Sequence, residues 1–186
     1  MIDYQNILRI LKEAKKATEK NDTFALKNLS DQTIHSCSLN QDEDNISIAV
    51  TIYSLSKIFG RENYKSISGW NKFYKLINQC LNESIKSLEQ NKTQEFKGHF
   101  VCLGKAINKI SGKLKGYIEE VFEKARINKA SRIYEHGISL GQTAKLLGVN
   151  LFELAGYAGQ TGISEVPMSR TIDIKSRVKL AEEMFS

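Results

Sequence analysis

The sequence has little proline, little cysteine and no long apolar run, and each scarcity excludes a class of protein. Among 186 residues only Pro167 is a proline, so nothing before it interrupts a helix as proline does. Cys37, Cys80 and Cys102 are widely spaced, odd in number and without a C-x-x-C pair, so we expect reduced core thiols rather than disulfides or zinc. No apolar run approaches the ~20 residues of a membrane span, and the first ten residues are too polar for a signal peptide. We therefore expect a soluble, cytoplasmic protein that crosses no membrane.

Apolar residues recur every three or four positions along most of the chain and predict an all-α fold. The predicted helices are Asp3–Lys20, Phe24–Leu39, Asp44–Phe59, Ser66 or Ser68 to Glu89, Gln94–Ile110, Lys113–His136, Leu140–Leu147 and Leu151–Gly159. The third of these is apolar on nearly all sides, so we expect it at the centre of a bundle. Its β-branched residues also suit a strand, but they do not alternate with polar residues.

Three parts are predicted along the chain. Residues 1–111 form an N-terminal helical bundle, and residues 112–163 form a long basic helix followed by a helix-turn-helix. Residues 164–186 form a short extended arm around Pro167 and then an amphipathic helix. A chain of this length buries an adequate core without disulfides or metal.

The predicted helix-turn-helix runs from Ser139 to Ile163, SLGQTAKLLGVNLFELAGYAGQTGI. Ser139 is a suitable N-cap for its first helix, and Asn150 is a suitable N-cap for its second. Gly148 follows the first helix, where a left-handed backbone is needed. Ala144 lies where the two helices cross, so a larger side chain there forces them apart. An ordinary helical hairpin at a domain edge is the alternative.

The second helix of this pair begins with few side chains that read DNA bases. A recognition helix presents Arg, Lys, Asn or Gln near its start, and here only Asn150 qualifies. Leu151 and Phe152 are apolar and favour contact with a protein. We predict that a partner binds these two residues and the apolar positions of the C-terminal tail, Ile174, Val178, Met184 and Phe185. The alternative for the tail is that it folds back on its own chain.

Positive charge is concentrated between Lys97 and Arg132. That segment holds 9 basic and 3 acidic residues, whereas the residues before and after it are close to balanced. Its cations lie ahead of the helix-turn-helix and predict contact with the phosphates of DNA or RNA, together with Asn150. The predicted nucleic-acid contacts are Lys105, Lys109, Lys113, Lys115, Lys124, Arg126, Lys129, Arg132 and Asn150. A solvated helix face, aided by neighbouring glutamates, is the alternative.

Catalytic and cofactor motifs are weak in this sequence. Gly98, Gly104 and Lys105 do not form a phosphate-binding loop, because the glycine spacing is wrong and Ala106 replaces the magnesium-binding hydroxyl. Arg132 and His136 are the one pair suited to phosphodiester cleavage, but a His before a C-capping Gly more often stabilises the helix end. The sequence therefore predicts no catalytic, cofactor or metal site and a protein that is not an enzyme.

The segment Lys129–Ile163, KASRIYEHGISLGQTAKLLGVNLFELAGYAGQTGI, resembles small archaeal helix-turn-helix proteins of antitoxin type, which are partners of PIN-domain ribonucleases. The resemblance rests on the helix, the Gly turn, the A-x3-G-V corner and the hydrophobic second helix. It implies that Ala144, Gly148, Val149 and Leu154 are scaffold and that Ser164–Phe185 holds the toxin. Residues 1–128 carry no such resemblance.

Together these patterns predict a non-enzymatic, antitoxin-like regulatory binding protein without a cofactor. Its basic helices contact DNA or RNA, and its second helix and tail bind a protein, a small PIN-type nuclease under the resemblance. The alternative is a protein–protein adaptor with no role in nucleic-acid binding, and a helical nuclease is a more distant third hypothesis.

Overall fold

The computed structural model describes residues 4–40, 43–98 and 112–162, and for residues 35–40 and 43 it describes the backbone alone. Every regular element in these ranges is a helix, which confirms the all-α prediction. The chain forms two compact units, Met1–Lys129 and Ala130–Ser186. None of the described helices is both long enough and apolar enough to cross a membrane.

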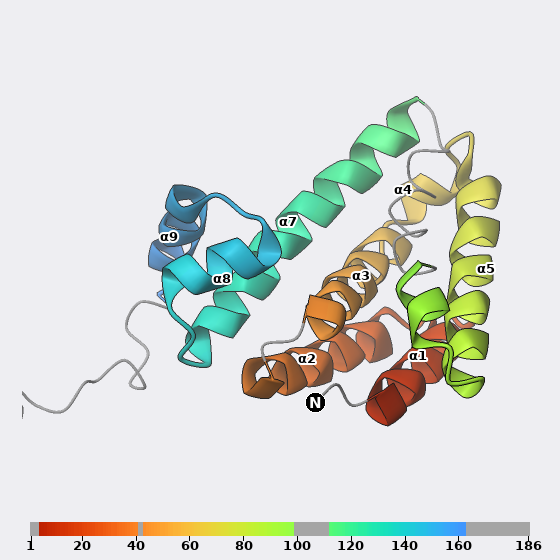
Figure 1. Ribbon diagram of the computed structural model, residues 1–186. Coiled ribbons are helices and arrows are strands. Elements are labelled where there is room, and N and C mark those ends of the chain that lie inside the picture. Colours follow the sequence, from red (N-terminus) through yellow and green to blue (C-terminus); the bar gives the residue numbers. More distant parts are fainter. Residues whose placement is uncertain (1–3, 41–42, 99–111, 163–186) are drawn as a thin grey trace, which may run out of the picture. The chain divides into compact units, whose positions relative to one another are not determined.

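The first unit is a helical bundle. Its helices are α1 (Tyr4–Glu19), α2 (Thr23–Asn40), α3 (Glu43–Phe59), α4 (Glu62–Lys65), α5 (Trp70–Glu89), a helical stretch at 93–98 and the first part of α7 (Lys113–Glu135). Helix α1 packs against α2 and α5, and α2 packs along α3 (Figure 1). These boundaries lie within a few residues of the predicted ones, except at α4 and at the start of α5. The predicted end of the fifth helix, Ile110, lies outside the described residues.

Helix α3 is the most completely buried helix of the bundle, as its sequence predicts. Ile48, Ile52, Leu55 and Ile58 are fully buried. Polar side chains in this helix are buried as well, and the Ser54 hydroxyl donates to the carbonyl of Val50, one turn earlier. Water does not reach a buried hydroxyl, so Ser54 forms its hydrogen bond with a carbonyl of its own helix.

The turn before α5 differs from the prediction. Ser66 and Ser68 were expected to open a helix, but α5 begins at Trp70 after Gly69, whose φ is 96°. Residues 62–65 instead form the short helix α4, which buries Tyr64. A single helical turn is too short to leave a periodic apolar pattern, so α4 could not be predicted from periodicity.

Phe24, the first residue of the predicted second helix, lies on the outside of α2 although it is apolar. Its side chain is 72% exposed. Among the α2 residues whose side chains are described, the buried ones are Leu26, Leu29, Ser30, Thr33 and Ile34, which follow three- and four-residue spacing. At 100° per residue Phe24 points away from that face, so its apolar character alone was misleading.

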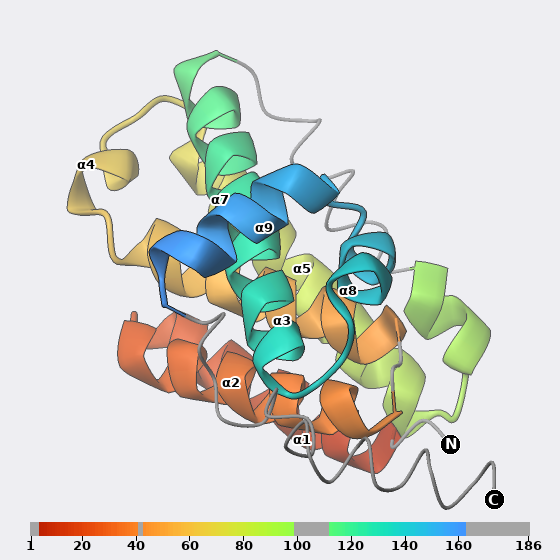
Figure 2. The same cartoon turned by 90° about the vertical axis from the view of Figure 1, so that its left-hand side faces the viewer.

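The second unit contains the last turns of α7, helix α8 (Leu140–Leu147) and helix α9 (Leu151–Gln160), which packs beside α8 (Figure 2). The predicted caps are confirmed. Ser139 accepts a hydrogen bond from the Gln142 amide, and Gly148 is left-handed with φ 62°. Asn150 accepts hydrogen bonds from the amides of Phe152 and Glu153, at 2.8 and 3.4 Å.

The boundary between the two units lies inside α7, after Lys129, whereas the sequence placed a boundary after residue 111. The first part of α7 belongs to the bundle because Leu114, Ile118 and Val121 are buried in its hydrophobic core. Most of the basic helix therefore belongs to the first unit. The predicted arm and helix at 164–186 lie outside the described residues.

Candidate functional site

Most of the cations on α7 are paired with glutamates one turn away on the same helix. The pairs are Lys115–Glu119 at 3.6 Å, Lys124–Glu120 at 2.5 Å, Arg126–Glu123 at 3.2 Å and Arg132–Glu135 at 2.9 Å. Such exposed pairs contribute little to stability. They do reduce the positive potential that a phosphate experiences, so the basic helix is a weaker phosphate clamp than its lysine and arginine content predicts.

The ion pair with Lys124 also lowers the pKa of Glu120. The hydrogen bond and the charge of Lys124 hold the pKa of the Glu120 carboxyl below its ordinary value, and the more distant charge of Arg61 acts in the same direction. The carboxylate is therefore ionised at neutral pH, and the Lys124 ammonium is already engaged. Lys105 and Lys109, two further predicted phosphate contacts, lie outside the described residues.

Lys129, one of the predicted nucleic-acid contacts, is buried and does not lie on the surface. Its side chain is 1% exposed. The Nζ atom lies 2.7 Å from Oδ1 of Asp31 on α2 and 4.1 Å from the ring centre of Tyr53 on α3. Burial of an ammonium requires such partners, because an unpaired charge in the interior is costly. Lys129 thus holds α7 to the bundle.

The start of α9 presents two neighbouring apolar side chains to solvent. Phe152 is 84% exposed and Leu151 is 43% exposed, while Leu154 on the opposite side is fully buried. The side-chain oxygen of Asn150, the one predicted base reader here, is occupied by the cap of α9. Leu151 and Phe152 therefore lie where the sequence placed them, on an accessible helix start.

Small residues continue this face along α9. Gly156 and Gly159 follow Phe152 by four and seven positions, so all three lie on one side of the helix. Both glycines are exposed, and a Cβ added at either would have nothing within 4 Å. The exposed face is thus one aromatic ring followed by bare backbone, on which another helix can approach closely. The tail residues predicted to share this role, Ile174, Val178, Met184 and Phe185, lie outside the described residues.

Arg132 and His136, the one residue pair considered for catalysis, lie near the end of α7 and in the turn after it. Arg132 donates to Glu135 at 2.9 Å, and His136 is exposed in the turn after α7. Within the described ranges no three His, Cys, Asp or Glu side chains gather where they could hold a metal ion. Cys80 is buried in the core of the bundle, where the sequence predicted a core cysteine.

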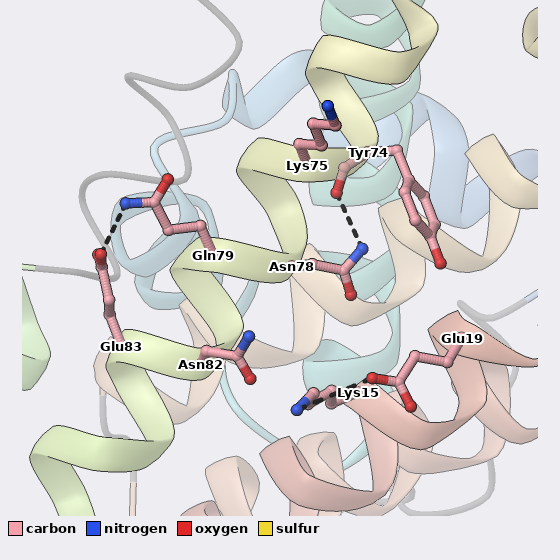
Figure 3. A pocket seen from close by; sticks show the side chains of 8 residues that line it. All are labelled: Lys15, Glu19, Tyr74, Lys75, Asn78, Gln79, Asn82 and Glu83. Atoms are coloured by element: carbon pink, nitrogen blue, oxygen red, sulfur yellow. Dashed lines mark hydrogen bonds and ion pairs between the residues drawn. The ribbon is translucent and has the colours of Figure 1, made fainter.

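An open groove between α1 and α5 was not predicted (Figure 3). It is lined by Lys15, Glu19, Tyr74, Lys75, Asn78, Gln79, Asn82 and Glu83. Its polar groups largely bond one another, because Asn78 donates to the carbonyl of Tyr74 and Gln79 donates to Glu83. Lys15 likewise lies 3.8 Å from Glu19. The groove therefore offers few unsatisfied groups to a ligand.

A second feature that sequence reasoning missed is an exposed aromatic ring on the first turns of α7. Tyr117 is a large apolar residue of α7, yet it is 40% exposed. The buried positions Leu114, Ile118 and Val121 place it at the edge of that face. Helical periodicity alone could have revealed this edge position.

The comparisons with known proteins give no relative for this chain. No family model, no curated protein and no solved structure matches it.

Proposed function

We propose that this chain is a non-enzymatic regulatory binding protein, and that α8 and α9 form a helix-turn-helix that docks a partner protein. The observation that carries the proposal is the 84% exposure of Phe152 at the start of α9. Burying a phenylalanine side chain contributes about 1.5–3 kcal/mol, and exposed aromatic side chains are typical anchors at protein interfaces. Leu151 and the glycine positions of α9 extend the docking surface.

The same helix is poorly suited to reading DNA. Leu151, Phe152 and Gly156 have no groups that hydrogen-bond to base edges, and Glu153 repels phosphates. The oxygen of Asn150 caps α9. Protein binding through α9 is therefore favoured over sequence-specific DNA binding through it.

The resemblance of Lys129–Ile163 to archaeal antitoxins supports a particular kind of partner, a small ribonuclease of PIN type. Under this proposal the chain binds and restrains that enzyme. The scaffold positions that the resemblance names fit this role, because Ala144 and Leu154 are buried while Phe152 beside them is exposed.

Affinity capture of the tagged full chain from nuclease-treated native extract tests the proposal. We expect a protein to be retained by the wild type and lost, by tenfold or more, with Phe152→Asp. This substitution introduces no buried charge, and a carboxylate in the first turn of α9 is favoured by the helix dipole. Phe24→Asp is the matched control, since Phe24 is an exposed phenylalanine near the start of a helix in the other unit.

The two variants separate a specific surface from general stickiness. Equal loss with Phe152→Asp and Phe24→Asp would show nonspecific hydrophobic capture. Full retention with Phe152→Asp, or a partner that disappears when nuclease is added, would contradict protein docking through α9.

A further inference from the structure

Two tyrosines of the bundle stack on each other near the beginning of α7. The ring centres of Tyr64 on α4 and Tyr117 on α7 are 5.3 Å apart, and the ring planes differ by 3°. Tyr64 is 3% exposed, whereas Tyr117 is 40% exposed. One side of the Tyr117 ring is therefore covered by a buried ring, and much of the remaining ring is open to solvent.

Arg61 holds the buried ring of Tyr64 in position. Its guanidinium donates a hydrogen bond to the phenolic oxygen of Tyr64, and its Cζ atom lies 5.2 Å from the centre of that ring. Tyr64 is thus fixed by packing and by a charge-assisted hydrogen bond. An exposed aromatic ring supported in this way loses little rotational freedom when a ligand stacks on it.

Positive charge lies beside the exposed ring. Lys113 is one helical turn before Tyr117, is exposed and forms no ion pair with any residue in the described ranges. Among the predicted cations on α7 it differs in this respect from Lys115 and Lys124, which have glutamate partners. Arg61 is also exposed, although its charge acts on the Glu120 carboxylate as well, so Lys113 is the cation of the two that the proposal depends on.

The helix surface next to the ring is open at position 116. Gly116 precedes Tyr117, and a Cβ added there would have nothing within 4 Å. Together with the 40% exposure of Tyr117, this leaves room for a ligand on that side of the helix. An open aromatic ring next to an available ammonium fits a ligand that has both a planar π-face and a negative charge.

We propose that Tyr117, supported by Tyr64 and flanked by Lys113 and Arg61, is a stacking site for single-stranded nucleic acid. A base stacks on the exposed face of Tyr117, and Lys113 contacts a neighbouring phosphate. The strand must be single, because bases in a duplex are stacked on one another and do not reach a protein ring. This inference goes beyond the proposed protein docking and uses a different unit of the chain.

Fluorescence anisotropy with a labelled twelve-nucleotide oligo(dT) or oligo(U) at low salt tests the site. We expect Tyr117→Ala to weaken binding about tenfold, because stacking of one base contributes about 1–3 kcal/mol. Tyr117→Phe keeps the ring and should bind within about twofold of the wild type. Lys113→Ala should weaken binding and lower the slope of log affinity against log salt by about 0.7.

Two controls make the result decisive. Phe24→Ala removes an exposed ring elsewhere in the same unit and should leave affinity unchanged. An abasic oligonucleotide of equal length should bind the wild-type chain much more weakly, and this comparison does not depend on how any variant folds. Absence of wild-type binding, equal affinity for the abasic strand, or equal loss with Phe24→Ala would overturn the proposal.

Discussion

At the scale of single residues, charge is the property that sequence describes least well. The sequence counts Lys129 with the other cations of α7, yet it is buried against Asp31 and Tyr53. Lys113 is exposed and Lys124 is paired. These three lysines differ only in what surrounds them in space, and that information comes from α2, α3 and the glutamates of α7. The composition of the segment could therefore predict its net charge but not which charges are available.

In the Lys129–Asp31 ion pair the ammonium is buried and the carboxylate is half exposed. Removing the carboxylate and removing the ammonium should therefore change the free energy of unfolding by different amounts. Asp31→Ala leaves a buried cation without its carboxylate and should lower the free energy of unfolding by about 2–3 kcal/mol. Lys129→Met keeps the volume and leaves Asp31, which is 49% exposed, to be solvated by water. It should cost less than about 1 kcal/mol. Urea denaturation of the two variants measures the difference, and a larger cost for Lys129→Met would show that the pair is not buried as described.

At the scale of helices, local signals gave the boundaries of α8 and α9 with little error. The caps at Ser139, Gly148 and Asn150 depend on hydrogen bonds and backbone conformation within three residues. The helix ends that they form can therefore be predicted from the sequence. Helix α4 and the start of α5 could not be found in this way. Tyr64 is buried by neighbours distant in sequence, and Gly69 caps α5 without a side chain.

Gly148 should be the most sensitive glycine of the α8–α9 turn. Its φ is 62°, so Gly148→Ala places a Cβ in a left-handed backbone and should destabilise this pair by about 1 kcal/mol. Gly141, inside α8, has ordinary helical backbone and open space around it, so Gly141→Ala should stabilise the pair by up to about 0.5 kcal/mol. Hydrogen exchange of the α8 and α9 amides reports both changes. The same sign for the two substitutions would contradict the assigned turn.

At the scale of the whole molecule, the two exposed aromatic surfaces lie on different units. The bundle carries the stacked pair Tyr64–Tyr117, and the unit from Ala130 onward carries the exposed start of α9. Helical periodicity could predict the all-α class and most of the bundle core. It could not place the boundary inside α7, because burial of Leu114 and Ile118 with α1–α5 is a long-range event.

Site-specific photocrosslinking at position 152 tests the central claim, protein docking through α9, most directly. A benzoylphenylalanine in place of Phe152 keeps an exposed aromatic ring and reacts only with what contacts it in the cell. We predict a discrete covalent adduct with a second, different protein, and no such adduct when the same group replaces Phe24, which is also largely exposed. Adducts only with the chain itself, or the same adducts from both positions, would contradict the account.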